Sequence, residues 1–316
     1  MNCKEKKKRA PFSLRRTISP LQRHMNRHAV LYMQAPFVIL FLLFIIIPVV
    51  IAIGISFTDF NSIEKPRFVG LENYINILTN DNIFTEFAIP NTIVYSVIVG
   101  VGGYILSFFL AWSLAQVPKG PRTVMAIILY LPSMTAGIML STVWQVFFAG
   151  DKVGYLNAIL LKLDLIQGPI TWLSDSRYLM LIMIVVSLWS SMGIGFLSML
   201  AGILNVNREL YEAAHIDGVK NRIQEIVYIT IPAIKPHMMF GAIMAIVNAF
   251  QNGSIGVQLS GANPTPGYAG QLLVTHAEEY AFVRYEMGYS AALAVILLLI
   301  IWGVSQLSKK LFAVRG

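Results

Sequence analysis

Long uncharged apolar stretches separated by short polar segments dominate this chain. Five clear stretches and a less regular sixth, which has Lys235 near its start, lie at residues 37–57, 92–117, 123–148, 178–204, 288–307 and 232–250. About 20 apolar residues in a helix cross the roughly 30 Å hydrocarbon core of a bilayer. The pattern therefore predicts an all-α integral membrane protein with six transmembrane helices, forming one domain over residues 36–316.

Composition supports the membrane class. Of the 316 residues, 56% are hydrophobic and 13% are charged, which departs in both respects from a soluble globular domain. Residues 1–35 form a basic tail with nine Lys and Arg. Such a tail can bind nucleic acid or anionic lipid, but we expect a disordered segment that fixes the topology, without a nucleic-acid partner.

The distribution of Lys and Arg predicts the orientation. With the N-terminus inside, 18 of the 24 Lys and Arg lie in inner segments, as the positive-inside rule requires. We therefore expect a multi-pass protein of the bacterial plasma membrane with both termini in the cytoplasm. The single cysteine, Cys3, excludes an intrachain disulfide, and the five histidines show no pattern that predicts a metal site.

Several function classes lack their usual residues. The five clear spans contain no Asp, Glu, Lys, Arg or His, so they offer no proton relay, although a sodium site of carbonyls and hydroxyls stays open. A Walker motif is absent, as are HExxH and GxSxG motifs. A membrane enzyme acting on lipid-linked substrates is the alternative class, but no acid–base pair sits at a span end. We expect a transport subunit without catalytic residues.

The polar segment over residues 205–236, between spans four and five, is the strongest functional signal. Asn207 is suited to cap a short helix, and Gly218 to end it in a left-handed conformation. A second short stretch follows, and Pro232 is expected to restart the chain as it enters the membrane. Two short helices that meet at a glycine would form an L-shaped lever for a partner outside the bilayer.

Three motifs resemble those of a known family. The polar segment contains Glu212-Ala213-Ala214 and Asp217-Gly218, and it ends in Ile229, Ile231 and Pro232. FVGLENY at residues 68–74 and MGYSAA at residues 287–292 are the other two. The chain resembles the permease subunits of binding-protein-dependent ABC importers, particularly those for oligosaccharides, with the MetI-like fold. It departs by an isoleucine before the proline, and by a glycine-to-proline interval about one residue longer than usual.

The resemblance implies function, site and partners. The polar segment would be a cytoplasmic coupling loop docking on an ATPase through Glu212, Ala213, Ala214, Asp217, Gly218, Arg222 and Pro232. This chain would bind no cofactor, because ATP and magnesium bind to the partner ATPase. It would form half of a sugar pathway with a second homologous permease, in a heterodimer, alongside two ATPase subunits and an extracytoplasmic sugar-binding lipoprotein. The same architecture serving an amino acid, peptide or phosphate ester is the alternative, and a secondary carrier is another.

Side-chain chemistry predicts the substrate pathway. Planar amides pair with sugar hydroxyls and aromatic rings lie against apolar sugar faces. Residues of these types within or near spans are Asn91, Tyr95, Trp144, Gln145, Trp189, Asn248 and Gln251. Interfacial anchoring and hydrogen bonding between helices are the alternative roles. Clustered cations would favour an anionic solute, and the spans contain none.

Overall fold

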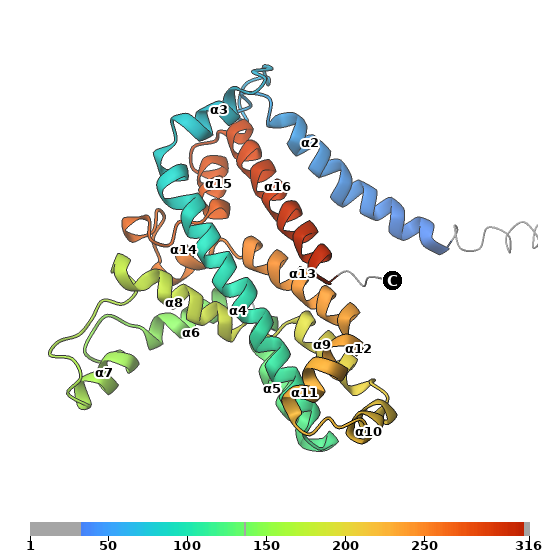
Figure 1. Cartoon of the computed structure of the whole chain (residues 1–316). Coiled ribbons are helices and arrows are strands. Elements are labelled where there is room, and N and C mark those ends of the chain that lie inside the picture. The colour runs from blue at the N-terminus through green and yellow to red at the C-terminus, as the bar shows by residue number, and fades with distance from the viewer. Residues whose placement is uncertain (1–32, 136, 313–316) are drawn as a thin grey trace, which may run out of the picture. The chain divides into compact units, whose positions relative to one another are not determined.

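The structure is a computed structural model that describes residues 33–135 and 137–312 (Figure 1). The described residues form helices joined by loops, and their only β-pairing is an isolated bridge between Thr58 and Phe68. The all-α prediction is thus confirmed. The expected disordered tail lies outside the described residues as far as residue 32.

The chain divides into two compact units, Met1–Ala52 and Ile53–Gly316. An apolar helix over Met33–Ile55 begins in the first unit and is 23 residues long, enough to cross a bilayer. It contains the π-helical turn η1 (Leu42–Ile46) and the helix α2 (Ile47–Ile55).

The second unit contains the other described helices. In chain order these are α3 (Glu72–Thr79), η2 (Phe84–Ala88), α4 (Ile89–Ala115), α5 (Lys119–Met134), α6 (Gly137–Phe147), α7 (Tyr155–Lys162), α8 (Ser176–Trp189), α9 (Ile194–Leu204), α10 (Arg208–Ile216), α11 (Arg222–Glu225), η3 (Ile226–Thr230), α12 (Ile231–Ala233), α13 (Lys235–Gln251), α14 (Ile255–Ser260), η4 (Pro266–Tyr268), α15 (Leu273–Phe282) and α16 (Met287–Phe312).

Four helices of the described residues are long and apolar enough to cross a membrane: Met33–Ile55, Phe84–Ala115, Ser176–Leu204 and Met287–Lys310. A fifth is a pair bent by 84°, Arg222–Ala233 with Lys235–Gln251. The expected third span corresponds to α5 and α6, which are separated at Thr135, where the backbone is extended. The count of six spans therefore stays a prediction.

The centre of the second unit is built from α4, α9 and α13, which pack against one another. Small residues permit this close packing: a Cβ added to Gly195 of α9 would lie 3.1 Å from Cα of Gly241 in α13. Phe196 and Met199 of α9 are buried there with Ile234. Figure 1 shows α10 and α11 toward one end of α4, and α3 and α15 toward its other end.

Candidate functional site

The coupling segment, residues 205–236, folds as two short helices on either side of a glycine. Asn207 caps α10, because its Oδ1 accepts a hydrogen bond from the backbone N–H of Glu209 at 3.1 Å. The helix ends at Ile216, and Gly218 has a φ of +97°. The predicted cap and the predicted left-handed glycine are both confirmed.

The end of α10 presents a mixed polar and apolar surface. Glu212, Ala213 and Asp217 are exposed, and Ala214 is half-buried. Ile216 is 86% exposed and Ile223, in α11, is 72% exposed. Exposed apolar side chains beside a carboxylate are typical of a surface that a partner protein covers.

A buried carboxylate links the two short helices. Glu225 of α11 has a side chain only 8% exposed, and it accepts a hydrogen bond from Nη1 of Arg222 at 2.8 Å. Its other oxygen lies 3.3 Å from Nε2 of His215 in α10. The sequence interpretation missed both Glu225 and His215. The only signal for Glu225 in the sequence was its i, i+3 spacing from Arg222, because residues at this spacing are neighbours on a helix.

A π-helical turn lies between Gly218 and Pro232. The turn η3 follows α11 directly, and the Thr230 hydroxyl donates to the carbonyl of Glu225, five residues earlier. A π-turn inserts one residue into a helix without ending it.

The prediction that Pro232 restarts the chain is wrong in position. Pro232 lies inside α12, which continues directly from η3. The chain turns at Ile234, and α13 begins at Lys235 with Pro236 in its first turn. Proline fits a first helical turn because its missing N–H is not needed there. Pro236 therefore has the role that was expected of Pro232.

A cavity of about 620 Å³ lies where α8 and α9 separate. The break between these helices spans residues 190–193, and α4, α13 and the end of α5 supply other walls. Its polar wall includes Ser133, Ser190, Ser191, Asn248, Gln251 and Asn252. Among the described residues that line it, none is Asp, Glu, Lys, Arg or His. The cavity therefore offers hydroxyls and amides but no ionic group.

Three of the predicted pathway residues belong to this cavity or its wall. Asn248 and Gln251 line it. Tyr95 is fully buried behind it, with its hydroxyl 2.7 Å from Oγ of Ser187 and 3.3 Å from Nδ2 of Asn252.

The other four predicted residues contact other parts of the protein. Nδ2 of Asn91 donates to the carbonyl of Tyr268 at 2.9 Å, and Nε2 of Gln145 donates to the carbonyl of Gln258 at 2.6 Å. The ring of Trp144 lies 5.4 Å from that of Trp189. The two amide contacts match the alternative of hydrogen bonding between helices, and substrate contact by these four residues stays a prediction.

The cavity serines were missed at the sequence level. Ser190 and Ser191 form part of the sequence Ser-Ser-Met-Gly inside an apolar run that was interpreted as one continuous span. Interrupted membrane helices often line binding sites, because their free backbone groups face a cavity. The small polar run was therefore the available signal.

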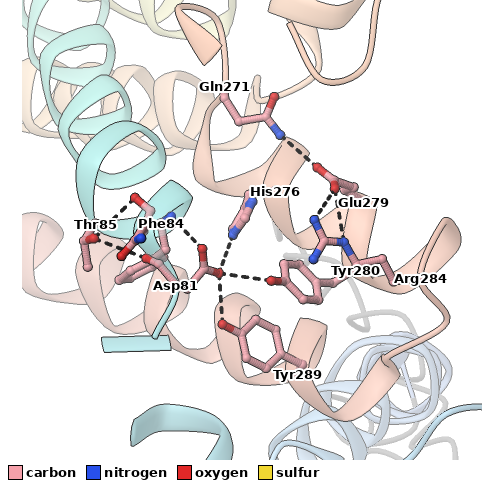
Figure 2. Close-up of polar contacts among 10 residues, drawn as sticks. Asp81, Phe84, Thr85, Gln271, His276, Glu279, Tyr280, Arg284 and Tyr289 are labelled. Atoms are coloured by element: carbon pink, nitrogen blue, oxygen red, sulfur yellow. Dashed lines mark hydrogen bonds and ion pairs between the residues drawn. The ribbon is translucent and has the colours of Figure 1, made fainter. Parts of the chain in front are cut away.

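A second polar cluster lies at the other end of α4 (Figure 2). Oδ2 of Asp81 accepts hydrogen bonds from Nε2 of His276 at 2.7 Å, from Tyr289 at 2.9 Å and from Tyr280 at 3.3 Å, and Oδ1 accepts from the N–H of Phe84 at 2.9 Å. Burial raises the pKa of Asp81, but these donors outweigh it and lower the pKa to about 2. The cluster ties the start of α4 to α15 and α16.

Two sequence motifs meet beside this cluster and hold one loop. Nδ2 of Asn73 donates to the carbonyls of Ser56 and Thr58, at 2.9 Å each. The N–H of Gly288 donates to the carbonyl of Phe60 at 2.9 Å. A Cβ on Gly288 would overlap the carbonyl oxygen of Thr58, so this close approach requires glycine. These motifs therefore have a structural role.

Comparison with known proteins identifies the family. Residues 103–311 match the family described as binding-protein-dependent transport system inner membrane component. The chain belongs to this family and is a membrane permease of an ABC transporter. It is 33% identical to the arabinooligosaccharides transport system permease protein AraP of Bacillus subtilis, over 88% of this chain and 86% of that protein.

Other relatives agree. The AraP protein of Halalkalibacterium halodurans is 32% identical over 86% of this chain and 83% of its own length. A chain from the crystal structure of a bacterial ABC transporter that imports the acidic polysaccharide alginate superposes with a TM-score of 0.73. It is 25% identical, and the match covers 92% of this chain and 98% of that one. The MetI-like permease fold is thereby confirmed.

Proposed function

We propose that this chain forms one half of the translocation pathway of an ATP-driven importer for uncharged oligosaccharides. The observation that carries the proposal is the cavity between α4, α8, α9 and α13, which has hydroxyl and amide groups in its wall. Relatives of this chain are permeases for arabinooligosaccharides, which supports a carbohydrate substrate.

The chemistry of the cavity favours a neutral sugar. Ser190, Asn248 and Gln251 can each donate and accept hydrogen bonds, as sugar hydroxyls do. A uronate or phosphorylated sugar would bring an anion against a wall to which the described residues contribute no cation, and an unpaired charge is costly to bury. We therefore assign neutral oligosaccharides to this half of the pathway.

Energy for transport comes from outside this chain. The exposed carboxylate of Glu212, the small Ala213 and the exposed apolar Ile216 support docking of α10 on a separate ATPase subunit. ATP and magnesium bind there, and this chain binds no cofactor of its own. The complete importer contains a second, different permease, two ATPase subunits and an extracytoplasmic sugar-binding lipoprotein.

This arrangement sets the topology. The coupling segment faces the cytoplasm, as do both termini, in a bacterial plasma membrane. Figure 1 shows α3 and α15 at the end of α4 opposite α10 and α11, and we place that end at the outer face, where the binding protein docks.

Uptake by the complete importer in proteoliposomes tests the proposal. With the sugar-loaded binding protein outside the vesicles and ATP inside them, we expect accumulation of arabinotriose against its gradient. Non-hydrolysable ATP should give no turnover. A second arm places this chain alone in liposomes with an imposed proton or sodium gradient and no ATP. Accumulation in that arm would show a secondary carrier and overturn the proposal.

The substrate class needs a direct comparison. Binding of arabinotriose and of an alginate trisaccharide to the detergent-solubilised importer, without the binding protein, isolates the contribution of the membrane cavity. Tighter binding of arabinotriose supports the neutral class. Tighter binding of the alginate trisaccharide would contradict it.

A further inference from the structure

The coupling segment has to transmit force although its helices are short. The helices α10 and α11 have nine and four residues, and Gly218 separates them. Helices this short have little stability of their own in water. A Cβ added to Gly218 would contact no heavy atom within 4 Å, so packing does not restrain this hinge. The angle between the helices must therefore be held by other contacts.

Side chains around Glu225 provide these contacts. Its carboxylate lies 3.3 Å from Nε2 of His215, which belongs to α10 on the other side of the hinge. It also accepts from Arg222 at 2.8 Å. A second link joins the hydroxyl of Tyr211 in α10 to Oγ1 of Thr230 in η3, at 3.0 Å.

The ring of His215 is held at both nitrogens. Nδ1 lies 3.0 Å from the carbonyl of Val219 and Nε2 lies 3.3 Å from the carboxylate of Glu225. His215 thus contacts residues on both sides of the hinge at Gly218.

We propose that Glu225 is a positioning residue for coupling, which holds α10 rigidly against α11 through His215. Movement of α10 then passes through η3 and α12 into α13 and is not absorbed at the hinge. This inference rests on the proposed docking of α10 on an ATPase. Glu225 differs from Glu212 in that its side chain is buried within this chain, so it acts on the lever and does not contact the partner.

The test compares Glu225→Gln with the unchanged importer, complete with both permeases, both ATPase subunits and binding protein. We expect ATPase subunits to co-purify normally and ATP hydrolysis to continue. The amount of arabinotriose transported per ATP hydrolysed should fall roughly tenfold, because a tenfold change corresponds to the loss of about 1.4 kcal/mol from a charged hydrogen bond. Glu225→Asp keeps the charge and should recover part of this ratio. Glu209→Gln, an exposed carboxylate of α10, is the matched control and should leave the ratio unchanged.

A second variant keeps the test valid if Glu225→Gln lowers the amount of folded protein. His215→Ala removes the same link by changing a side chain that is 53% exposed. This variant should therefore fold normally and show the same fall in arabinotriose transported per ATP hydrolysed. The two changes together should cost no more than Glu225→Gln alone, because both break the same link between α10 and α11. A wild-type ratio from His215→Ala, or independent effects of the two changes, would overturn the positioning role.

Three further outcomes separate this inference from the function on which it rests. Loss of ATPase co-purification in Glu225→Gln would show that Glu225 contacts the ATPase. This outcome would contradict the positioning role and leave the proposed function intact. Unchanged coupling in Glu212→Lys would instead remove α10 as the docking element. Uncoupling by Glu212→Lys together with a normal Glu225→Gln importer would refute only the positioning role.

Discussion

Replacing Asp81 by Asn should destabilise the end of the permease opposite the coupling segment. The carboxylate is 5% exposed and accepts four hydrogen bonds, three of them at Oδ2. An asparagine has one acceptor and one donor group in place of two acceptors. In one orientation the amide nitrogen faces the three donors at the Oδ2 position, and these lose their acceptor. In the other orientation the amide nitrogen faces the N–H of Phe84, which then loses its acceptor.

The magnitude follows from the lost bonds. Removing one partner from a buried charged network costs about 2 to 4 kcal/mol. A change of 1 kcal/mol shifts Tm by about 2 to 4 °C in a domain of this size, so the expected loss is on the order of 5 to 10 °C. This loss of Tm is measured by heating the detergent-solubilised importer and monitoring the release of this subunit. Glu86→Gln, which neutralises an exposed carboxylate close to Asp81 in sequence, is the control.

The pH dependence gives a second check on the same group. The pKa of Asp81 is lowered from its ordinary 3.8 to about 2. A lowered carboxyl pKa stabilises the fold fully above the unfolded value, and this stabilisation is lost as the pH falls toward the folded value. The difference in Tm between the wild type and Asp81→Asn should thus be constant from about pH 5 to pH 8 and shrink below about pH 4. A Tm of Asp81→Asn equal to that of the wild type at neutral pH would refute the reasoning.

Substitutions at three further positions test the coupling segment and the cavity. Glu212→Lys should leave membrane abundance normal and abolish ATP-driven uptake, because it places a cation where we propose that the ATPase meets a carboxylate; normal uptake would contradict the docking role. Gly218→Val should reduce uptake more than Gly218→Ala, since a φ of +97° costs a non-glycine residue about 1 to 2 kcal/mol and a β-branched one more; equal, wild-type uptake by both would show that the hinge angle is unimportant. Asn248→Asp adds an anion to the uncharged wall and should weaken binding of arabinotriose roughly tenfold, the result of losing about 1.4 kcal/mol, with ATP hydrolysis unchanged; undiminished binding would place the sugar elsewhere.

Local signals in the sequence predicted the coupling segment well. The cap at Asn207 and the left-handed Gly218 depend on nearest neighbours, and the structure shows both. The position of the turn into α13 was harder, because Pro232 and Pro236 both fit a helix start. The π-helical turn η3 and then α12 continue α11 past the first proline, and only then does the chain turn at Ile234.

Contacts between distant residues could not be predicted in the same way. Asp81 and His276 are 195 positions apart, and a single sequence does not reveal which carboxylate meets which imidazole. The contacts of the predicted pathway residues could not be predicted for the same reason. An amide such as Gln145 has the chemistry to bind a sugar, but it bonds to the carbonyl of Gln258 because helix packing brings α6 against α14. Side-chain type predicts what a residue can bind, and packing decides what it meets.

The course of α13 connects the coupling segment with the cavity. Its first turn follows the bend at Ile234, which is 1% exposed and packs in the core with Phe196 of α9. Its last turn carries Asn248 and Gln251 into the cavity wall. Because the bend is buried and not solvent-exposed, a displacement of α12 cannot be absorbed there without disturbing the packing of α9. Contact between Gly195 and Gly241 then joins α13 to α9, which forms the other side of the cavity. A shift of the coupling segment is therefore expected to change the separation of the helices around the cavity, which is the mechanical step that alternating access requires.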